Sequence, residues 1–133
     1  MDLSSMTFSV IAGIGGNGFS GDGGAATTAA FDGPLGVGIA TNTDIFIADT
    51  HNHRIRRIDG ATGIISTIAG NGTPGFFGEG VPAIQSTTDF PASLKLDHAG
   101  NLNFADRYKH VIRRLSLDST PPVITGIPSN CSV

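Results

Sequence analysis

The sequence predicts an all-β protein in which one short antiparallel unit is used twice. Its 19 glycines stand beside only 14% charged residues, an excess typical of a compact β protein with many tight turns. Apolar residues alternate in short runs bounded by Gly, Pro, Asn or Asp, which indicates short strands joined by turns. No window has the period of an amphipathic helix. The third observation is an internal repeat that covers most of the chain.

The repeat has a single register. Residues 8–59 align with residues 65–116 at a constant offset of 57 without a gap, and 18 aligned positions are identical. Among them are Ile11-Ala12-Gly13 with Ile68-Ala69-Gly70, Gly18-Phe19 with Gly75-Phe76, Pro34 with Pro91, Ala48-Asp49 with Ala105-Asp106, His53 with His110, and Ile55-Arg56-Arg57 with Ile112-Arg113-Arg114. The chain therefore divides into a leader at 1–6, a first repeat at 7–63, a second repeat at 64–118 and a tail at 119–133.

We expect each repeat to contribute short strands, because the alternation of apolar residues has period two. The first predicted strand precedes the first complete blade, and its sequence matches the fourth strand of a blade. The predicted strands are Ser9–Ala12, Gly36–Ala40, Ile45–Ala48, Arg54–Ile58, Ile65–Ala69, Ser93–Leu96, Leu102–Ala105 and Val111–Leu115. The sequence predicts at least seven strands and almost no helix.

Glycine-rich passages at Gly13–Gly24 and Gly70–Gly80 precede the strands of each repeat. Their backbone must turn repeatedly, in part at positive φ, which favours glycine. Four short antiparallel strands, a long passage and the same unit again are typical of consecutive blades of a β-propeller. A twisted four-stranded sheet cannot bury both of its faces alone, so we expect neighbouring blades to stack on it.

Four stretches of the chain resemble the NHL-repeat family. They are Ile68-Ala69-Gly70-Asn71-Gly72, Gly18-Phe19-Ser20-Gly21-Asp22-Gly23-Gly24, Gly33-Pro34-Leu35-Gly36-Val37 and Ile47-Ala48-Asp49-Thr50-His51-Asn52-His53-Arg54-Ile55-Arg56. The resemblance covers roughly residues 7–117. It implies a six-bladed propeller as the usual full domain, and roles in binding proteins, RNA or cell-surface ligands. A few propellers of this class are lyases that use zinc and calcium, but no residue set here carries such a site over.

The second repeat departs from the first at a few positions. Lys95 and Asn103 stand where the first repeat has Gly38 and Phe46, and Tyr108-Lys109 replaces His51-Asn52. We expect from these changes that the second blade is an edge or terminal blade.

Two interpretations of the tail stay open. The stretch 119–128 resembles the linker and first strand of an immunoglobulin-like domain, which implies an extracellular multidomain parent; alternatively, Val123–Ile127 forms the fourth strand of the second blade. An extracellular or cell-surface location also suits the sequons at Asn71 and Asn130. Residues 1–7 have no signal peptide, no apolar run is long enough to span a membrane, and the lone Cys131 forms no internal disulfide.

Polar residues that recur in both repeats are predicted to be structural. Asp49 and Asp106 end a strand, where an aspartate can accept hydrogen bonds from the backbone two residues on, and His53 and His110 follow in the same turn. A catalytic residue is needed once, whereas a turn is needed in every blade. We therefore expect no catalytic residue, with a metal-dependent lyase as the enzymatic alternative.

No metal or other cofactor is expected. Zinc needs three or four converging ligands, and Asp49, His51 and His53 form the one candidate set. Calcium takes six to eight oxygens, more than Asn17, Asp22 and Glu79 can offer. Glycine turns with solvated carboxylates are the favoured interpretation of those loops.

Seven of the eight basic residues lie in the two hairpins between the second and third strands. A tentative basic stripe there consists of Arg54, Arg56, Arg57, Arg107, Lys109, Arg113 and Arg114. Such a stripe can receive an acidic protein or a phosphate backbone. Nucleic acid is the second choice, because aromatic residues for base stacking are not interleaved and the net charge is −3. Pairing with Asp49, Asp59 and Asp106 is the structural alternative.

The sequence thus predicts a non-catalytic binding or interaction scaffold whose partners are proteins or other propeller blades. Two blades cannot close a ring, because propellers use about four to eight. We expect either that further blades belong to the same parent chain or that copies of the chain assemble. In the second case Phe8–Gly13 of one copy would complete the last blade of its neighbour, and three copies would form a closed ring.

Overall fold

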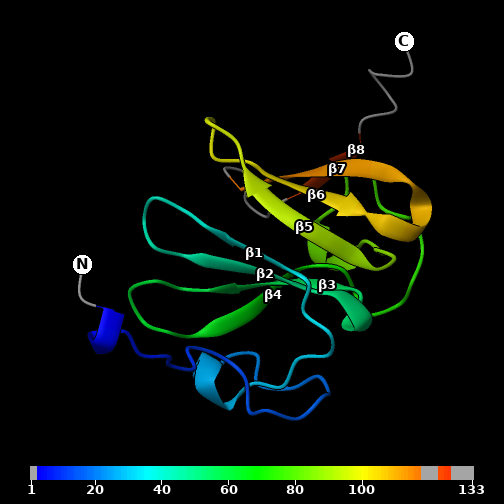
Figure 1. Cartoon of the computed structure of the whole chain (residues 1–133). Coiled ribbons are helices and arrows are strands. Elements are labelled where there is room, and N and C mark those ends of the chain that lie inside the picture. Colours follow the sequence, from blue (N-terminus) through cyan, green and yellow to red (C-terminus); the bar gives the residue numbers. More distant parts are fainter. Residues whose placement is uncertain (1–2, 118–122, 127–133) are drawn as a thin grey trace.

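The computed structural model describes residues 3–117 and 123–126, and they form two four-stranded antiparallel sheets (Figure 1). The first sheet has the order β1-β2-β3-β4 and the second the order β5-β6-β7-β8. The strands are β1 (Gly36–Ile39), β2 (Ile45–Asp49), β3 (Arg54–Ile58), β4 (Ile65–Ala69), β5 (Pro91–Leu96), β6 (Leu102–Asp106), β7 (Val111–Ser116) and β8 (Val123–Gly126). Helix within the described residues is limited to single 3-10 turns: η1 (Leu3–Ser5), η2 (Ala26–Thr28), η3 (Thr50–Asn52), η4 (Ala83–Gln85) and η5 (Arg107–Lys109). The predicted all-β fold is confirmed.

Seven of the predicted strands are present, with ends that agree to within about two residues. The strand predicted at Ser9–Ala12 is wrong: this segment is irregular, and Phe8 and Val10 are exposed. Its sequence matches β4, but a fourth strand needs the edge of a third strand to pair with. The described residues offer no such edge, because β3 is already paired with β2 and β4.

The fourth strand of the second sheet comes from the tail. Ile124 of β8 lies opposite Leu115, as Ile65 of β4 lies opposite Ile58, and both isoleucines are fully buried. This position is therefore filled by the chain's own residues, so the predicted insertion of Phe8–Gly13 from a neighbouring copy is wrong. The part of the tail at 118–122 and 127–133 lies outside the described residues.

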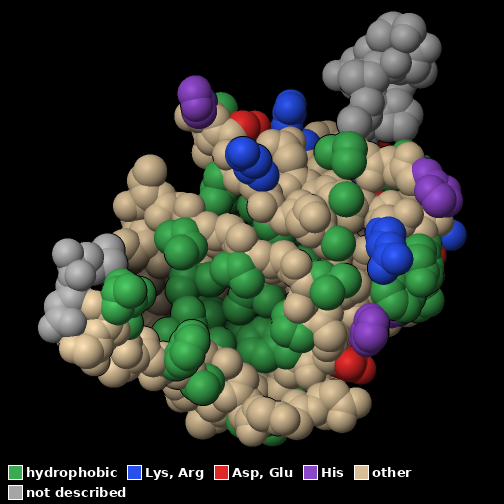
Figure 2. Space-filling model, in the orientation of Figure 1, with side chains coloured by type: hydrophobic (Ala, Val, Ile, Leu, Met, Phe, Trp, Pro, Cys, Tyr) green, Lys and Arg blue, Asp and Glu red, His purple; other side chains and the backbone are tan. Residues whose placement is uncertain are grey.

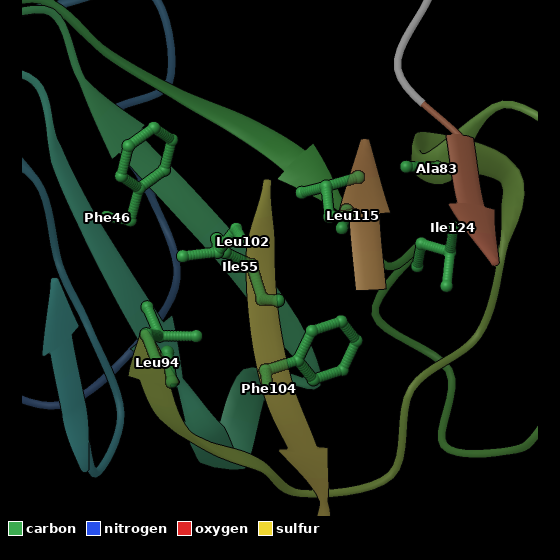
Figure 3. Packing of buried hydrophobic residues seen from close by; sticks show 10 residues of the cluster. Phe46, Ile55, Ala83, Leu94, Leu102, Phe104, Leu115 and Ile124 are labelled. Carbon is green, nitrogen blue, oxygen red and sulfur yellow. The ribbon is translucent and has the colours of Figure 1, made fainter. Parts of the chain in front are cut away.

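The main core lies between the two sheets. Residues directly opposite each other in an antiparallel pair share a face, and the pairing puts Phe46, Ala48 and Ile55 on the face of the first sheet that meets the second. Figure 3 shows these strands facing the apolar side of the second sheet. The members contributed by that side are Leu94, Leu102, Phe104, Leu115 and Ile124.

The opposite face of the first sheet is partly covered by the glycine-rich passage, by which we mean the whole segment between the strands, residues 13–32 in the first repeat and 70–89 in the second. Ala26 and Ala29 pack on Ile47, Ile58 and Ile65. The passage also exchanges backbone hydrogen bonds with β4, since the amide of residue 23 donates to the carbonyl of residue 65 and the amide of residue 65 donates to the carbonyl of residue 24. A close approach fixes one turn as glycine, because a Cβ at Gly21, where φ is +96°, would lie 2.6 Å from the Ala29 backbone.

Each sheet retains an outer face that the other sheet does not cover. On the outer face of the first sheet, Val37 and Ile39 of β1 are 61% and 65% exposed. On the outer face of the second sheet the register places Lys95, Asn103 and Arg114 side by side. In Figure 2 hydrophobic side chains gather over the first sheet, while Lys and Arg side chains lie over the second. None of the described helices is long and apolar enough to cross a membrane.

Candidate functional site

The most conspicuous polar groups of the repeat form two equivalent buried ion pairs. Arg56 Nη1 lies 3.3 Å from Asp49 Oδ2 in the first sheet, and Arg113 Nη1 lies 2.9 Å from Asp106 Oδ2 in the second. All four side chains are fully buried. Asp49 and Asp106 are the last residues of β2 and β6, the second strands of their sheets. Arg56 and Arg113 lie on the neighbouring third strands, β3 and β7.

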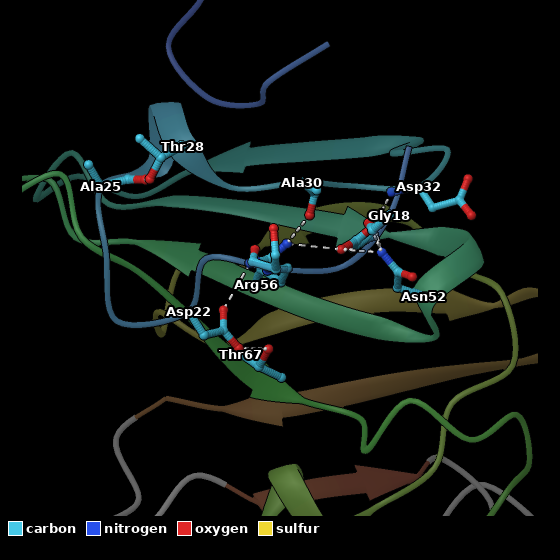
Figure 4. Close-up of polar contacts among 11 residues, drawn as sticks. Gly18, Asp22, Ala25, Thr28, Ala30, Asp32, Asn52, Arg56 and Thr67 are labelled. Atoms are coloured by element: carbon cyan, nitrogen blue, oxygen red, sulfur yellow. Dashed lines mark hydrogen bonds and ion pairs between the residues drawn. The ribbon is translucent and has the colours of Figure 1, made fainter. Parts of the chain in front are cut away.

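These pairs hold the glycine-rich passages against the sheets, and Figure 4 shows the contacts of Arg56 in the first repeat. Arg56 donates hydrogen bonds of 2.7 Å to the backbone carbonyls of Ser20 and Ala30. Asp49 Oδ1 accepts the amide hydrogen of Asp32 at 2.9 Å, a donor 17 residues earlier in the chain. The prediction that this aspartate accepts from the backbone two residues on is therefore wrong, because its acceptor atoms face the passage.

The second repeat has the same arrangement. Asp106 Oδ1 accepts the amide hydrogen of Asp89 at 2.7 Å, and Arg113 Nη1 donates to the carbonyl of Thr87 at 2.7 Å. Burial raises the pKa of Asp49 and of Asp106, and the facing amide and guanidinium groups oppose that rise. Both carboxylates form hydrogen bonds with groups of the fold. Because their side chains are fully buried, they are not accessible to a ligand.

The predicted basic stripe is wrong at Arg56 and Arg113, which are buried. The remaining cations do not line up either. Arg54 stacks on Phe19 with its guanidinium carbon 3.7 Å from the ring centroid, whereas Arg57 donates to Asp44 at 2.7 Å. Arg114 lies on the outer face of the second sheet, where it donates to Asn103 at 3.0 Å.

The carboxylates weighed as metal ligands are occupied by arginines. Asp22 lies 3.0 Å from Arg56, and Glu79 takes the equivalent place 3.1 Å from Arg113. Within residues 3–117 and 123–126 no three His, Cys, Asp or Glu side chains come together in a way that could hold a metal ion. Asp49 in particular is paired with its buried arginine.

The turns η3 and η5 place both repeated histidines in the left-handed region, with φ of 52° for His53 and 59° for His110. His53 Nδ1 accepts the amide hydrogen of Phe90 at 3.2 Å, which requires a neutral imidazole. Phe90 itself has φ of 58°, which is rare for a bulky residue, and it takes the place of Gly33 in the first repeat. His53, at the end of the η3 turn in the first sheet, thus holds the backbone of Phe90 in this unfavourable conformation, directly before β5 of the second sheet.

An aromatic-basic patch lies around this turn, and it consists of His51, Phe90, Arg107, Tyr108 and Lys109. The Phe90 ring contacts those of His51 and Tyr108, with centroids 5.3 Å and 4.4 Å away. Tyr108 is 50% exposed, and Lys109 pairs with Asp89 at 3.3 Å. Arg107 is exposed and has no carboxylate partner among the described residues. This patch was not predicted from the sequence as one surface, because its residues come from two repeats and only the fold brings them together.

A cleft is a second feature of the surface. It has a volume of about 790 Å³ and lies between the β1–β2 and β5–β6 hairpins. Its apolar floor includes Ile39, Phe46 and Leu96, and its rim carries Arg57 and Asp97. The rim arginine is already paired with Asp44, so the aromatic-basic patch offers the more available polar groups.

Comparison with known proteins agrees with this architecture. The NHL repeat model matches residues 31–58. Protein SUPPRESSOR OF QUENCHING 1, chloroplastic, from Arabidopsis thaliana is 35% identical over 85 residues, which cover 64% of this chain and 8% of that protein. NHL repeat-containing protein 2 of Gallus gallus is 50% identical over 52 residues, which cover 39% of this chain and 7% of that protein. The chain therefore spans less than a tenth of the length of these relatives.

A solved structure of a Bacteroides thetaiotaomicron protein of unknown function superposes with a TM-score of 0.62 over 75% of this chain and 23% of that one. At 20% identity, this similarity bears on the fold alone. Two stacked four-stranded sheets, each preceded by a passage held by a buried Asp–Arg pair, are blades of a β-propeller. The chain therefore contains an NHL repeat at residues 31–58 and is similar to NHL repeat-containing proteins.

Replacing Arg113 by Ala should cost about 3–5 kcal/mol of unfolding free energy, because Asp106 would keep its buried charge without its partner. Denaturant unfolding monitored by circular dichroism measures the change. Arg114→Ala is the matched control, since Arg114 is exposed and its loss should cost at most about 1 kcal/mol. Equal losses in the two variants would contradict a structural role for the buried pair.

The neutral state of His53 predicts a pH-dependent stability. Burial lowers the pKa of His53 below its ordinary value of 6.5, although the carboxylate of Asp89 acts in the opposite direction. As the pH falls below 6.5, His53 therefore takes up a proton in the unfolded chain before it does so in the folded protein. The free energy of unfolding decreases over that range. His53→Asn cannot take up the proton and tolerates positive φ, so its stability should fall less between pH 7 and pH 5. Parallel pH profiles for the two proteins would refute this assignment.

Proposed function

We propose that the chain is a non-catalytic binding scaffold that recognises an acidic segment of a partner protein through the aromatic-basic patch. The observation that carries the proposal is how the two repeats use their polar residues. The ion pair that both repeats contain, Asp49 with Arg56 and its equivalent Asp106 with Arg113, is buried in the fold. The exposed residues of the patch differ between the repeats, which is what a single recognition site needs.

The chemistry of the patch favours a protein partner. In the first repeat Thr50 is buried and Asn52 donates to Asp49, so this turn is used internally. In the second repeat the same turn exposes Arg107 and Tyr108, the residue types that most often dominate binding energy at protein interfaces. A partner that supplies carboxylates to Arg107 and an apolar or aromatic side chain to the rings would satisfy both.

Binding of a short fluorescent peptide of Asp, Glu and Phe, followed by anisotropy, tests the proposal. Changing Arg107 and Tyr108 together to Ala should weaken binding about tenfold or more, since each 1.4 kcal/mol is tenfold in affinity. Arg114→Ala removes an exposed cation elsewhere and should leave the affinity unchanged. No binding, or equal losses in both variants, would defeat the proposal. Salt-sensitive binding of oligouridine without binding of the peptide would favour the RNA alternative.

We also propose that the parent protein is extracellular or exposed at the cell surface. Asn71 of the sequon Asn71-Gly72-Thr73 is exposed on a loop, where an oligosaccharide could be attached without displacing the core. Mass spectrometry of the protein isolated from its source should then find a glycan on Asn71 that is lost in Asn71→Gln. An unmodified Asn71 in the secreted protein, or recovery of the protein from the cytosol, would count against this location.

A further inference from the structure

Two asparagines of the chain stand directly before a glycine, in the pairs Asn17-Gly18 and Asn71-Gly72. Both asparagines are exposed. In such a pair the backbone nitrogen of the glycine can attack the side-chain carbonyl carbon of the asparagine, because no Cβ on the second residue hinders the approach. The attack requires that this nitrogen first lose its proton. The two pairs have the same sequence chemistry, but the fold surrounds their amide groups differently.

The pair Asn17-Gly18 is held by the first sheet's passage. The amide hydrogen of Gly18 donates to the carbonyl of Phe31 at 2.9 Å. The carbonyl of Gly18 also accepts a 2.8 Å hydrogen bond from the side chain of Asn52. A nitrogen whose proton is shared with an acceptor, in a peptide fixed on both sides, is a poor nucleophile. The fold therefore protects Asn17.

The pair Asn71-Gly72 lacks this protection. No acceptor within residues 3–117 and 123–126 takes the amide hydrogen of Gly72. Instead, Asn71 Oδ1 accepts the amide hydrogen of Thr73 at 2.9 Å. This hydrogen bond closes a ring over the peptide of Gly72, which brings the side-chain carbonyl carbon toward the glycine nitrogen. It also draws electrons from that carbon, so the carbon is the better electrophile.

Arg54 acts on the other partner of the reaction. Its Nη2 donates a 3.0 Å hydrogen bond to the backbone carbonyl of Asn71, which belongs to the same peptide group as the nitrogen of Gly72. When that nitrogen loses its proton, most of the negative charge moves to this carbonyl oxygen, where the guanidinium stabilises it. The guanidinium is itself held in place, because its carbon lies 3.7 Å from the centroid of the Phe19 ring.

We propose that Asn71 is a site of spontaneous conversion to aspartate and isoaspartate, and that Arg54 promotes this conversion. The nitrogen of Gly72 forms a bond to Asn71 Cγ, the bond from Cγ to the side-chain nitrogen breaks, and that nitrogen leaves as ammonia with the proton from the glycine amide. Water then opens the cyclic imide at one of its two carbonyls. One water is consumed and one ammonia released, so no oxidant or other reagent is needed.

The two products differ in how well they fit the loop. Aspartate keeps an oxygen for the amide of Thr73 and places a negative charge close to Arg54. Isoaspartate adds one carbon to the backbone, and the loop has little room for it, because even a Cβ at Gly70 or Gly72 would overlap the carbonyl of His53 or the guanidinium of Arg54. The isoaspartyl form should therefore lose the contact with Arg54.

A glycan on Asn71 would be attached to the same side-chain nitrogen, so the two modifications exclude each other. The conversion depends neither on the aromatic-basic patch nor on the location of the protein. It is therefore tested on the full chain made in bacteria, free of glycan.

Peptide mapping by mass spectrometry, with separation of aspartyl from isoaspartyl peptides, follows the reaction during incubation at mildly alkaline pH. Both products should accumulate several-fold faster at Asn71 than at Asn17. In denaturant the two asparagines should react at equal rates, because the difference comes from the fold. Arg54→Gln should slow the reaction at Asn71 about tenfold, the size expected for the loss of a charge-assisted hydrogen bond. Arg114→Gln, which removes an exposed guanidinium elsewhere, should leave the rate unchanged.

Three results would overturn the proposal. One is equal rates at Asn17 and Asn71 in the folded chain. Another is an Asn71 that stays unmodified while the denatured chain reacts. The third concerns Arg54 alone: a reaction at Asn71 that is as fast or faster in Arg54→Gln, with a circular dichroism spectrum like that of the unmodified chain, would show that the guanidinium does not promote it.

Discussion

A four-stranded sheet with two apolar faces must be covered on both, and the rest of this structure follows from that constraint. The first sheet buries one face against the second sheet and part of the other against the glycine-rich passage. Covering a sheet with irregular chain is demanding, because such a passage lacks the continuous backbone hydrogen bonding of a strand and its buried polar groups still need partners. Its position has to be fixed by side chains that reach out from the sheet.

The buried Asp–Arg pairs meet that demand. Removing two charges from water is unfavourable, and their mutual attraction does not by itself offset the loss. Here the guanidinium of Arg56 also donates to two backbone carbonyls of the passage, and the carboxylate of Asp49 accepts a backbone amide. The pair therefore supplies hydrogen-bond partners to backbone groups of the passage, although Arg56 Nε itself is buried without one. That shared role explains why the pair occurs in each repeat.

The repeat made the fold predictable, since an ungapped offset of 57 residues placed seven strands near their positions. The error at Ser9–Ala12 has a physical origin: sequence similarity shows what a segment can form, whereas a strand also requires a neighbouring edge. The burial of Arg56 had a signal, because period-two alternation puts it on the same face as the buried Ile58. The aromatic-basic patch had none, because the left-handed turn at His53 and the positive φ of Phe90 become evident only in three dimensions.

Comparing the two repeats position by position separates the fold from what is particular to this chain. At Asp49 and Asp106 both repeats keep an aspartate that is buried and holds the passage. Where they differ at structurally equivalent positions, the first repeat uses the residue to join a neighbouring sheet, and the second exposes a polar or charged group. Thr50 shows this most directly, because it is tied to Pro91 across the sheets, whereas its equivalent Arg107 is exposed. The turn that joins the two sheets in the first repeat therefore exposes Arg107 and Tyr108 in the second, and these are the residues of the proposed binding patch.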